Sequence, residues 1–146
     1  MKKFLLGVGI VMTAWSAHAA DPLNGTIWKT IDDETKQAKS LVMFKEQSNG
    51  TLTATIQKVF NATEEAKCSL CEGTYHNRSL KGAVIVSGLK NVGSHRYEDG
   101  KITDPKSGKT YSLKGELTNN DRILKLRGYM GVALLGRNQT WIRVSE

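Results

Sequence analysis

The sequence predicts an all-β protein of about eight short antiparallel strands, arranged as a barrel or as a sandwich. Two observations carry this prediction. Apolar and polar residues alternate in short segments, and polar turns separate these segments at fairly even spacing. Helical periodicity of useful length is absent from the sequence. Near the C-terminus, Gly128, Gly131 and Gly136 punctuate an apolar stretch, which is typical of a bulge or a barrel corner.

Residues 1–19 have the pattern of a secretory leader. Two early lysines, an apolar stretch over 4–15 and an Ala-His-Ala triplet over 17–19 match its three regions. We expect cleavage after Ala19, with Ala20 as the alternative, and a single domain over 20–146. The apolar stretch is too short for a spanning helix. The sequence therefore predicts a protein of the periplasm or a secreted protein, with no membrane span.

The mature chain is moderately basic. Without residues 1–19 it has 19 Lys and Arg against 14 Asp and Glu, a net charge of about +5. This charge suits weak contact with an anionic envelope surface, although an ordinary solvated basic face is the alternative interpretation. Nucleic acid is excluded as an expected partner, because no basic run is interleaved with aromatic residues.

The N-terminal half predicts three strands and one long connection. Strands are expected over 26–31, 40–46 and 51–60. Ser48-Asn49-Gly50 predicts a hairpin turn, because Asn-Gly tolerates the positive φ of tight turns. The alternation breaks over 61–82, and so long a connection in a small β protein is usually functional or a lid.

The C-terminal half predicts the remaining strands, separated by turns rich in Asp, Asn and Gly. The expected segments are 83–89, 95–103 with an internal turn at Asp99-Gly100, 109–117, 122–129 and 141–145.

Several motifs, in order along the chain, resemble a known bacterial family. They are Gly25-x-x-Trp28-x-Thr30, Cys68-x-x-Cys71-x-Gly73, Leu80-Lys81-Gly82, Asp104-Pro105-x-x-Gly108-Lys109-x-Tyr111, and a final run from Arg127-Gly128-Tyr129-x-Gly131 to Gly136-Arg137-x-Gln139-Thr140-Trp141-x-Arg143. Over nearly the whole mature chain, the sequence resembles the envelope family catalogued as domain of unknown function 2147, whose fold is similar to that of lipocalins. It departs from the family pattern at Tyr97 to Gly100, and before Leu80, where the family has a proline.

The resemblance implies a lipocalin-like barrel of about eight strands with room for one small apolar molecule. The family carries no established activity. In lipocalins a Trp of the first strand packs under an Arg from near the chain end. Trp28 with Arg143, or with Arg127, would form this structural lock at the closed end by a cation–π contact.

Cys68 and Cys71 are the two cysteines of the chain. In an oxidising compartment we expect a disulfide that pins the long connection and adds little stability, because its ring is short. A redox site is an alternative, but it needs a βαβ setting that this chain lacks. A zinc site is another, with His76 as third ligand and His95 or Glu72 as fourth. We expect the disulfide, and neither metal nor cofactor.

Four residues are candidates for ligand binding. Tyr129, Arg137 and Trp141 surround the glycine-rich stretch, where aromatic walls would hold an acyl chain and Arg137 an anionic head group. Tyr75, in the long connection, is the fourth candidate. The alternative interpretation is that the aromatic residues pack in the core and Arg137 is a surface cation.

A catalytic constellation is not evident. His76 and His95 are the histidines of the mature chain, and no Ser-His-Asp or Cys-His ordering accompanies them. We therefore expect a protein that is not an enzyme and that binds or carries a small amphipathic or hydrophobic molecule in its barrel. The alternative is an envelope structural or protein-interaction module with a filled barrel.

Overall fold

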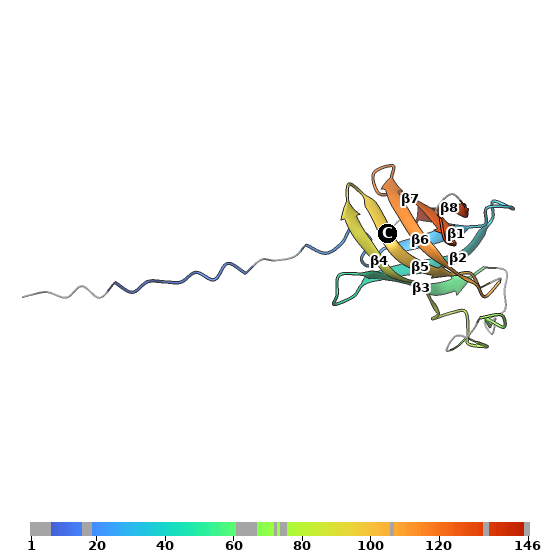
Figure 1. Ribbon diagram of the computed structural model, residues 1–146, viewed down its shortest axis with the longest axis horizontal. Coiled ribbons are helices and arrows are strands. Elements are labelled where there is room, and N and C mark those ends of the chain that lie inside the picture. Colours follow the sequence, from blue (N-terminus) through green and yellow to red (C-terminus); the bar gives the residue numbers. More distant parts are fainter. Residues whose placement is uncertain are drawn as a thin grey trace, which may run out of the picture.

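The structure is a computed structural model that describes residues 7–15, 19–60, 67–71, 73, 76–105, 107–132 and 135–144. It contains the strands β1 (Ile27–Ile31), β2 (Ala38–Glu46), β3 (Leu52–Val59), β4 (Val84–Gly93), β5 (Arg96–Thr103), β6 (Thr110–Thr118), β7 (Ile123–Tyr129) and β8 (Gly136–Arg143). Each strand pairs antiparallel with the next, and β1 also pairs with β8, which closes the barrel (Figure 1). The predicted all-β fold is confirmed, and the arrangement is a barrel.

The hairpin between β4 and β5 corrects one predicted turn. Ser94 and His95 form the turn, with φ of 53° and 61°, as a two-residue hairpin loop requires. The predicted turn at Asp99-Gly100 is wrong, because β5 continues through it as an irregularity. There the register with β6 shifts between Tyr97 and Gly100, and Asp99 has φ of 61°.

The last strand begins earlier than predicted. Pairing between β7 and β8 starts at Tyr129 with Gly136 and runs to Ile123 with Ile142. Residues 137–140 are all polar, so they lack the apolar alternation that marks a half-buried strand. Their hydrogen-bonded pairing with β7 makes them a strand despite this composition.

The segment before β1 closes one end of the barrel. Leu23 is fully buried, and the backbone pairs with β2 through Gly25 N to Phe44 O at 2.9 Å and Phe44 N to Thr26 O at 3.0 Å. The Asp21 carboxylate accepts hydrogen bonds from Tyr97 Oη and from Asn91 Nδ2, both at 2.9 Å. Residues 21–26 therefore form a plug, fixed to β2, β4 and β5.

Large side chains fill the barrel above this plug. The residues that are essentially inaccessible to solvent are mostly bulky and come from all eight strands: Trp28, Val42, Phe44, Leu52, Val86, Leu89, Tyr97, Leu113, Leu124 and Trp141. Because an eight-stranded barrel has an interior about as wide as its own side chains, these residues leave no room at this end. This is the closed half of the barrel.

Different segments of the chain lie at the two ends of the barrel (Figure 1). The N-terminal arm leaves from the plugged end, whereas the long β3–β4 connection, in green, lies at the opposite end. Residues 7–15 are exposed and belong to no helix or strand. In the part of the chain that the structure describes, no helix has the length and apolar character needed to cross a membrane.

Candidate functional site

The half of the barrel opposite the plug is hollow. A cavity of about 910 Å³ occupies it, and residues of all eight strands line its wall. Leu113, Leu126 and Trp141 lie where this cavity meets the filled half. The β1–β2 turn, the β3–β4 connection and the β7–β8 loop contribute residues to its mouth.

Small side chains at interior positions explain why this half is hollow. Thr30, Ser40 and Gly128 lie on the same strands as Trp28, Phe44 and Leu124, but nearer the mouth. Thr30 Oγ1 and Ser40 Oγ are 2.7 Å apart and satisfy each other as hydrogen-bond partners. At Gly128 a Cβ would stand 3.7 Å from Tyr111 Cβ and 3.8 Å from Ile102 Cγ2, which is ordinary contact distance.

Trp141 is one of the predicted ligand residues that the structure places at the cavity. It is 1% exposed and packs against Phe44 with ring centroids 6.0 Å apart. Its Nε1 donates a hydrogen bond to Gln139 Oε1 at 3.0 Å, so the polar edge of the ring is satisfied. Trp141 thus joins the packed core to the cavity floor, which combines the two interpretations considered from sequence.

Arg137 also lines the cavity, but its charge is already paired. Its Nε donates to Asp33 Oδ2 at 3.1 Å and its Nη2 to Asp33 Oδ1 at 2.6 Å. The hydrogen bond from Arg137 lowers the pKa of Asp33, and the same bond raises the pKa of Arg137. Because Asp33 occupies the Nε–Nη2 edge and balances the charge, an anionic head group would gain less from Arg137 than from an unpaired guanidinium.

Two predicted residues are not in the described cavity wall. Tyr129 is paired with Ser112 and Gly136, and it follows Gly128, which faces inward, so its own side chain lies on the outer face. A role of Tyr129 in ligand binding therefore stays a prediction. Tyr111, one strand away, lines the cavity instead. Tyr75 lies outside the described residues.

The residues of the predicted Trp–Arg lock are neighbours in the sheet. Trp28 of β1 lies directly opposite Arg143 of β8, and Trp28 Nε1 donates to Thr26 Oγ1 at 2.7 Å. Within the described residues, the recorded cation–ring contact is instead Lys58 Nζ, 5.5 Å from the Phe60 centroid. Arg127, the other candidate, donates from Nη1 to Asn138 Oδ1 at 2.8 Å. The lock itself stays a prediction.

The predicted disulfide between Cys68 and Cys71 is present, with both residues at most 5% exposed. Arg78 O accepts from Cys68 N, and Asn77 N donates to Cys68 O, both at 2.9 Å. The disulfide therefore lies in one arm of a small hairpin, here called the disulfide hairpin. His76 Nδ1 lies 2.9 Å from Cys71 O, within hydrogen-bond distance of the backbone.

The zinc alternative that uses His95 is wrong. His95 belongs to the β4–β5 turn at the plugged end, and its Nδ1 lies 3.5 Å from Asp121 Oδ1. Glu72 lies outside the described residues. No group of three or more His, Cys, Asp or Glu side chains suited to a metal ion occurs among the residues that the structure describes.

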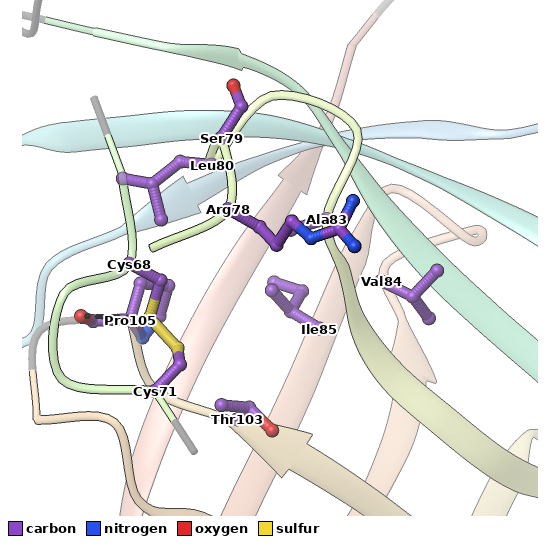
Figure 2. A pocket seen from close by; sticks show the side chains of 10 residues that line it. All are labelled: Cys68, Cys71, Arg78, Ser79, Leu80, Ala83, Val84, Ile85, Thr103 and Pro105. Carbon is purple, nitrogen blue, oxygen red and sulfur yellow. Dashed lines mark hydrogen bonds between the residues drawn. A yellow bond between two sulfur atoms is a disulfide. The ribbon is translucent and has the colours of Figure 1, made fainter. Parts of the chain in front are cut away.

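The disulfide hairpin packs on the β5–β6 turn. Gly108 has φ of +73°, and a Cβ there would overlap the Leu70 carbonyl, so only glycine allows this approach. Figure 2 shows the disulfide beside Pro105, where Cys68 Sγ is 3.8 Å from Pro105 O. The disulfide, Pro105 and the start of β4 line a small pocket of about 10 Å³, the size of roughly one water. Because Pro105 also lines the large cavity, the hairpin supports the cavity wall.

Among the cavity residues that sequence reasoning did not single out for ligand binding are Tyr111, Gly128 and Asp33, and for the first two a signal was present. Tyr111 alternates in step with Leu113 and Leu117, and Gly128 with Leu124 and Leu126, so strand periodicity assigns both to the interior. Asp33 carries no such signal, because it lies in a turn and meets Arg137 only when the barrel closes.

Comparisons with known proteins agree with this architecture. The sequence profile of a family described as "uncharacterized protein conserved in bacteria (DUF2147)" matches residues 26–143. A solved structure described as "Protein HP1028 from the human pathogen Helicobacter pylori belongs to the lipocalin family" is similar to this chain, with a TM-score of 0.74 and 29% sequence identity. The similarity covers 85% of this chain and 84% of that one. Among curated proteins, none matches the chain. By this match the chain belongs to the bacterial DUF2147 family, and its barrel is lipocalin-like.

Proposed function

We propose that this protein binds one small hydrophobic or amphipathic molecule in the open half of its barrel. The single observation that carries the proposal is the cavity of about 910 Å³. Its volume falls in the range of roughly 300–1,000 Å³ that small-molecule pockets occupy. The plug and the packed core close it from below, so a ligand would enter at the mouth.

The chemistry of the wall supports an apolar ligand body with a polar end. Ile56, Ile85, Ile102 and Leu113 offer apolar contact in the barrel interior. Polar groups lie mainly at the mouth, where Arg137 and Asp33 form an ion pair with no net charge. A neutral polar end is compatible with this pair, whereas an anionic end would also meet the negative charge of Asp33.

We further propose that the protein is exported, with residues 1–19 as its leader, and acts in the periplasm or outside the cell. The sequence pattern of the leader supports this location. A buried disulfide is compatible with it, since disulfides persist in oxidising compartments. The alternative, an interaction module with a filled barrel, agrees less well with a barrel of which one half is hollow.

The first test is native mass spectrometry of protein purified from the periplasm without detergent, followed by organic extraction. A stoichiometric small molecule in the extract would support the proposal and identify the ligand class. Recovery of the protein only in the cytoplasm, with residues 1–19 intact, would contradict the proposed export.

The second test blocks the cavity. Gly128→Phe would place a large side chain in it, whereas Gly128→Ala adds one methyl group at ordinary contact distance and serves as the matched control. Titration with the neutral dye N-phenyl-1-naphthylamine should show enhanced fluorescence with the wild type and the Ala variant, and at least tenfold weaker binding with the Phe variant. Equal dye binding by all three folded proteins would contradict a ligand site in the barrel.

A further inference from the structure

The β7–β8 loop exposes apolar side chains at the rim of the barrel. Met130, Val132 and Leu135 are 52%, 59% and 73% exposed. Leu135 N donates to Val132 O at 3.1 Å, so part of the turn's backbone is satisfied within the loop itself. Met130 and Leu135 also line the cavity, which makes the exposed apolar surface continuous with the cavity wall. An exposed apolar surface of this kind indicates an interaction site.

Cations lie on the outer face of the barrel next to this loop. Tyr129 precedes Met130, and opposite it Ser112 accepts a hydrogen bond from Lys101 Nζ at 3.1 Å. Two residues further from the loop, Arg127 lies directly opposite Lys114. Of the outward residues of β6 and β7, Glu116 is acidic, and it faces Lys125 at the far end of the strand pair.

Two of the aspartates that line the cavity are paired with cations. Asp33 is held by Arg137, and Asp32 lies 3.7 Å from Lys39 Nζ. The side chains of these two aspartates are 25% and 15% exposed, less than those of the cations that pair with them. Asp104 also lines the cavity, in the β5–β6 turn that ends at Lys109. The positive charge near the loop is therefore that of Lys101, Lys114 and Arg127 on the outer face of β5, β6 and β7.

We propose that the β7–β8 loop docks the barrel on an anionic lipid surface. Met130, Val132 and Leu135 enter the boundary between head groups and acyl chains, and Lys101, Lys114 and Arg127 lie over the phosphates. A protein partner fits less well, because three side chains of one loop are far from the roughly 800 Å² per partner of a stable interface. In this orientation the cavity mouth opens on the lipid. The proposal goes beyond ligand binding and does not require it.

Co-sedimentation with vesicles tests the docking. We expect the protein to bind phosphatidylglycerol/phosphatidylethanolamine vesicles more tightly than phosphatidylcholine vesicles, with affinity that falls as salt increases. Val132→Asp should weaken binding about tenfold, because a charge replaces an inserted apolar side chain. Lys114→Glu should weaken binding at least about fivefold on the anionic vesicles, with little effect on phosphatidylcholine.

A matched control is available at the other end of the barrel. Val92, 49% exposed, lies in β4 beside Asn91, which is bonded to the plug. Val92→Asp makes the same chemical change away from the loop and should leave vesicle binding unchanged. Binding that is equal for the wild type and Val132→Asp, or equally weak for both Asp variants, would overturn the proposal. So would a dimer of the wild type, without vesicle binding, that Val132→Asp converts to a monomer.

Dye binding in solution separates this proposal from the one for the cavity. Val132 does not line the cavity, so Val132→Asp should bind N-phenyl-1-naphthylamine as the wild type does. Vesicle binding without dye binding would contradict only the ligand site. Dye binding without vesicle binding would contradict only the docking surface.

Discussion

Asp33 and Arg137, which are 104 residues apart in the chain, join the β1–β2 turn to the start of β8 through two hydrogen bonds of 2.6 and 3.1 Å. The pair lies at the mouth of the cavity, so the first and last strands meet there by side chains as well as by their backbone pairing. Its geometry is bidentate, which a lysine at position 137 would not reproduce.

The contribution of this pair to stability should be small. The side chain of Arg137 is 58% exposed, and exposed ion pairs contribute roughly 0.2–1 kcal/mol. A double-mutant cycle with Asp33→Asn and Arg137→Gln, followed by urea unfolding, measures the coupling. We expect a value in that range that decreases with added salt. A coupling above about 2 kcal/mol would show that the pair is shielded from solvent far more than its exposure implies.

The contribution of the Asp33–Arg137 pair to stability should depend on pH. Since the pKa of Asp33 is lowered in the folded state, its contribution to stability is present above the unfolded value near 3.8 and is lost as the pH falls through the lower folded value. Carbon-detected NMR of the Asp33 carboxyl group should give a pKa below 3.8. Arg137→Gln should raise that pKa toward the usual value, and an unchanged pKa in this variant would contradict the assigned cause.

Gly108 should be intolerant of any side chain. In Gly108→Ala the new methyl group would overlap the Leu70 carbonyl, and the backbone would keep a φ of +73°. We therefore expect the free energy of unfolding to fall by about 2–4 kcal/mol. Gly131 has a similar φ of +70° with nothing within 4 Å, so Gly131→Ala should cost only about 1–2 kcal/mol. Urea unfolding of the two variants measures the difference, and equal losses would argue against the close approach of the disulfide hairpin.

The attachment of the plug to the barrel should depend on the hydroxyl of Tyr97. Tyr97 is buried, and its hydroxyl donates to Asp21 Oδ1, so Tyr97→Phe removes a hydrogen bond to a carboxylate at a cost of about 1–3 kcal/mol. Tyr111→Phe is the control, because no hydrogen bond of its hydroxyl is recorded in the described structure. Equilibrium unfolding should rank the Tyr111 variant close to the wild type. A Tyr97 variant as stable as the control would mean that the hydrogen bonds from Asn91 Nδ2 and Leu23 N hold the Asp21 carboxylate without the tyrosine hydroxyl.

The Cys68–Cys71 disulfide should be formed in all molecules but should contribute little to the free energy of unfolding. Maleimide labelling of protein made in the periplasm should find no free thiol until a reductant is added. The ring spans a sequence separation of three residues, so its loss in the double variant Cys68→Ser, Cys71→Ser should cost about 2 kcal/mol or less. Reductant should shift the urea midpoint of the wild type and leave that of the double variant unchanged. Reactive thiols at both positions without reductant would refute the prediction.

Local sequence determined most of the strands and one feature of the long connection. Alternation placed β3, β6 and β7 close to their observed bounds, and an apolar run did the same for β2. Ser48-Asn49-Gly50 forms the predicted turn, with φ of +81° at Gly50. The Cys68–Cys71 disulfide also followed from short spacing and the expected compartment. These features depend on neighbouring residues, whose preferences the chain displays directly.

The tertiary structure alone decided the site. Closure of β1 on β8 brings Asp33 to Arg137, and the small residues at positions 30, 40 and 128 leave a cavity only because they face one another inside a closed barrel. The outward orientation of Tyr129 likewise follows from its register with Ser112 and not from the glycine-rich stretch around it. Contacts between distant segments depend on the register and closure of the whole sheet, and no local pattern of residues encodes them.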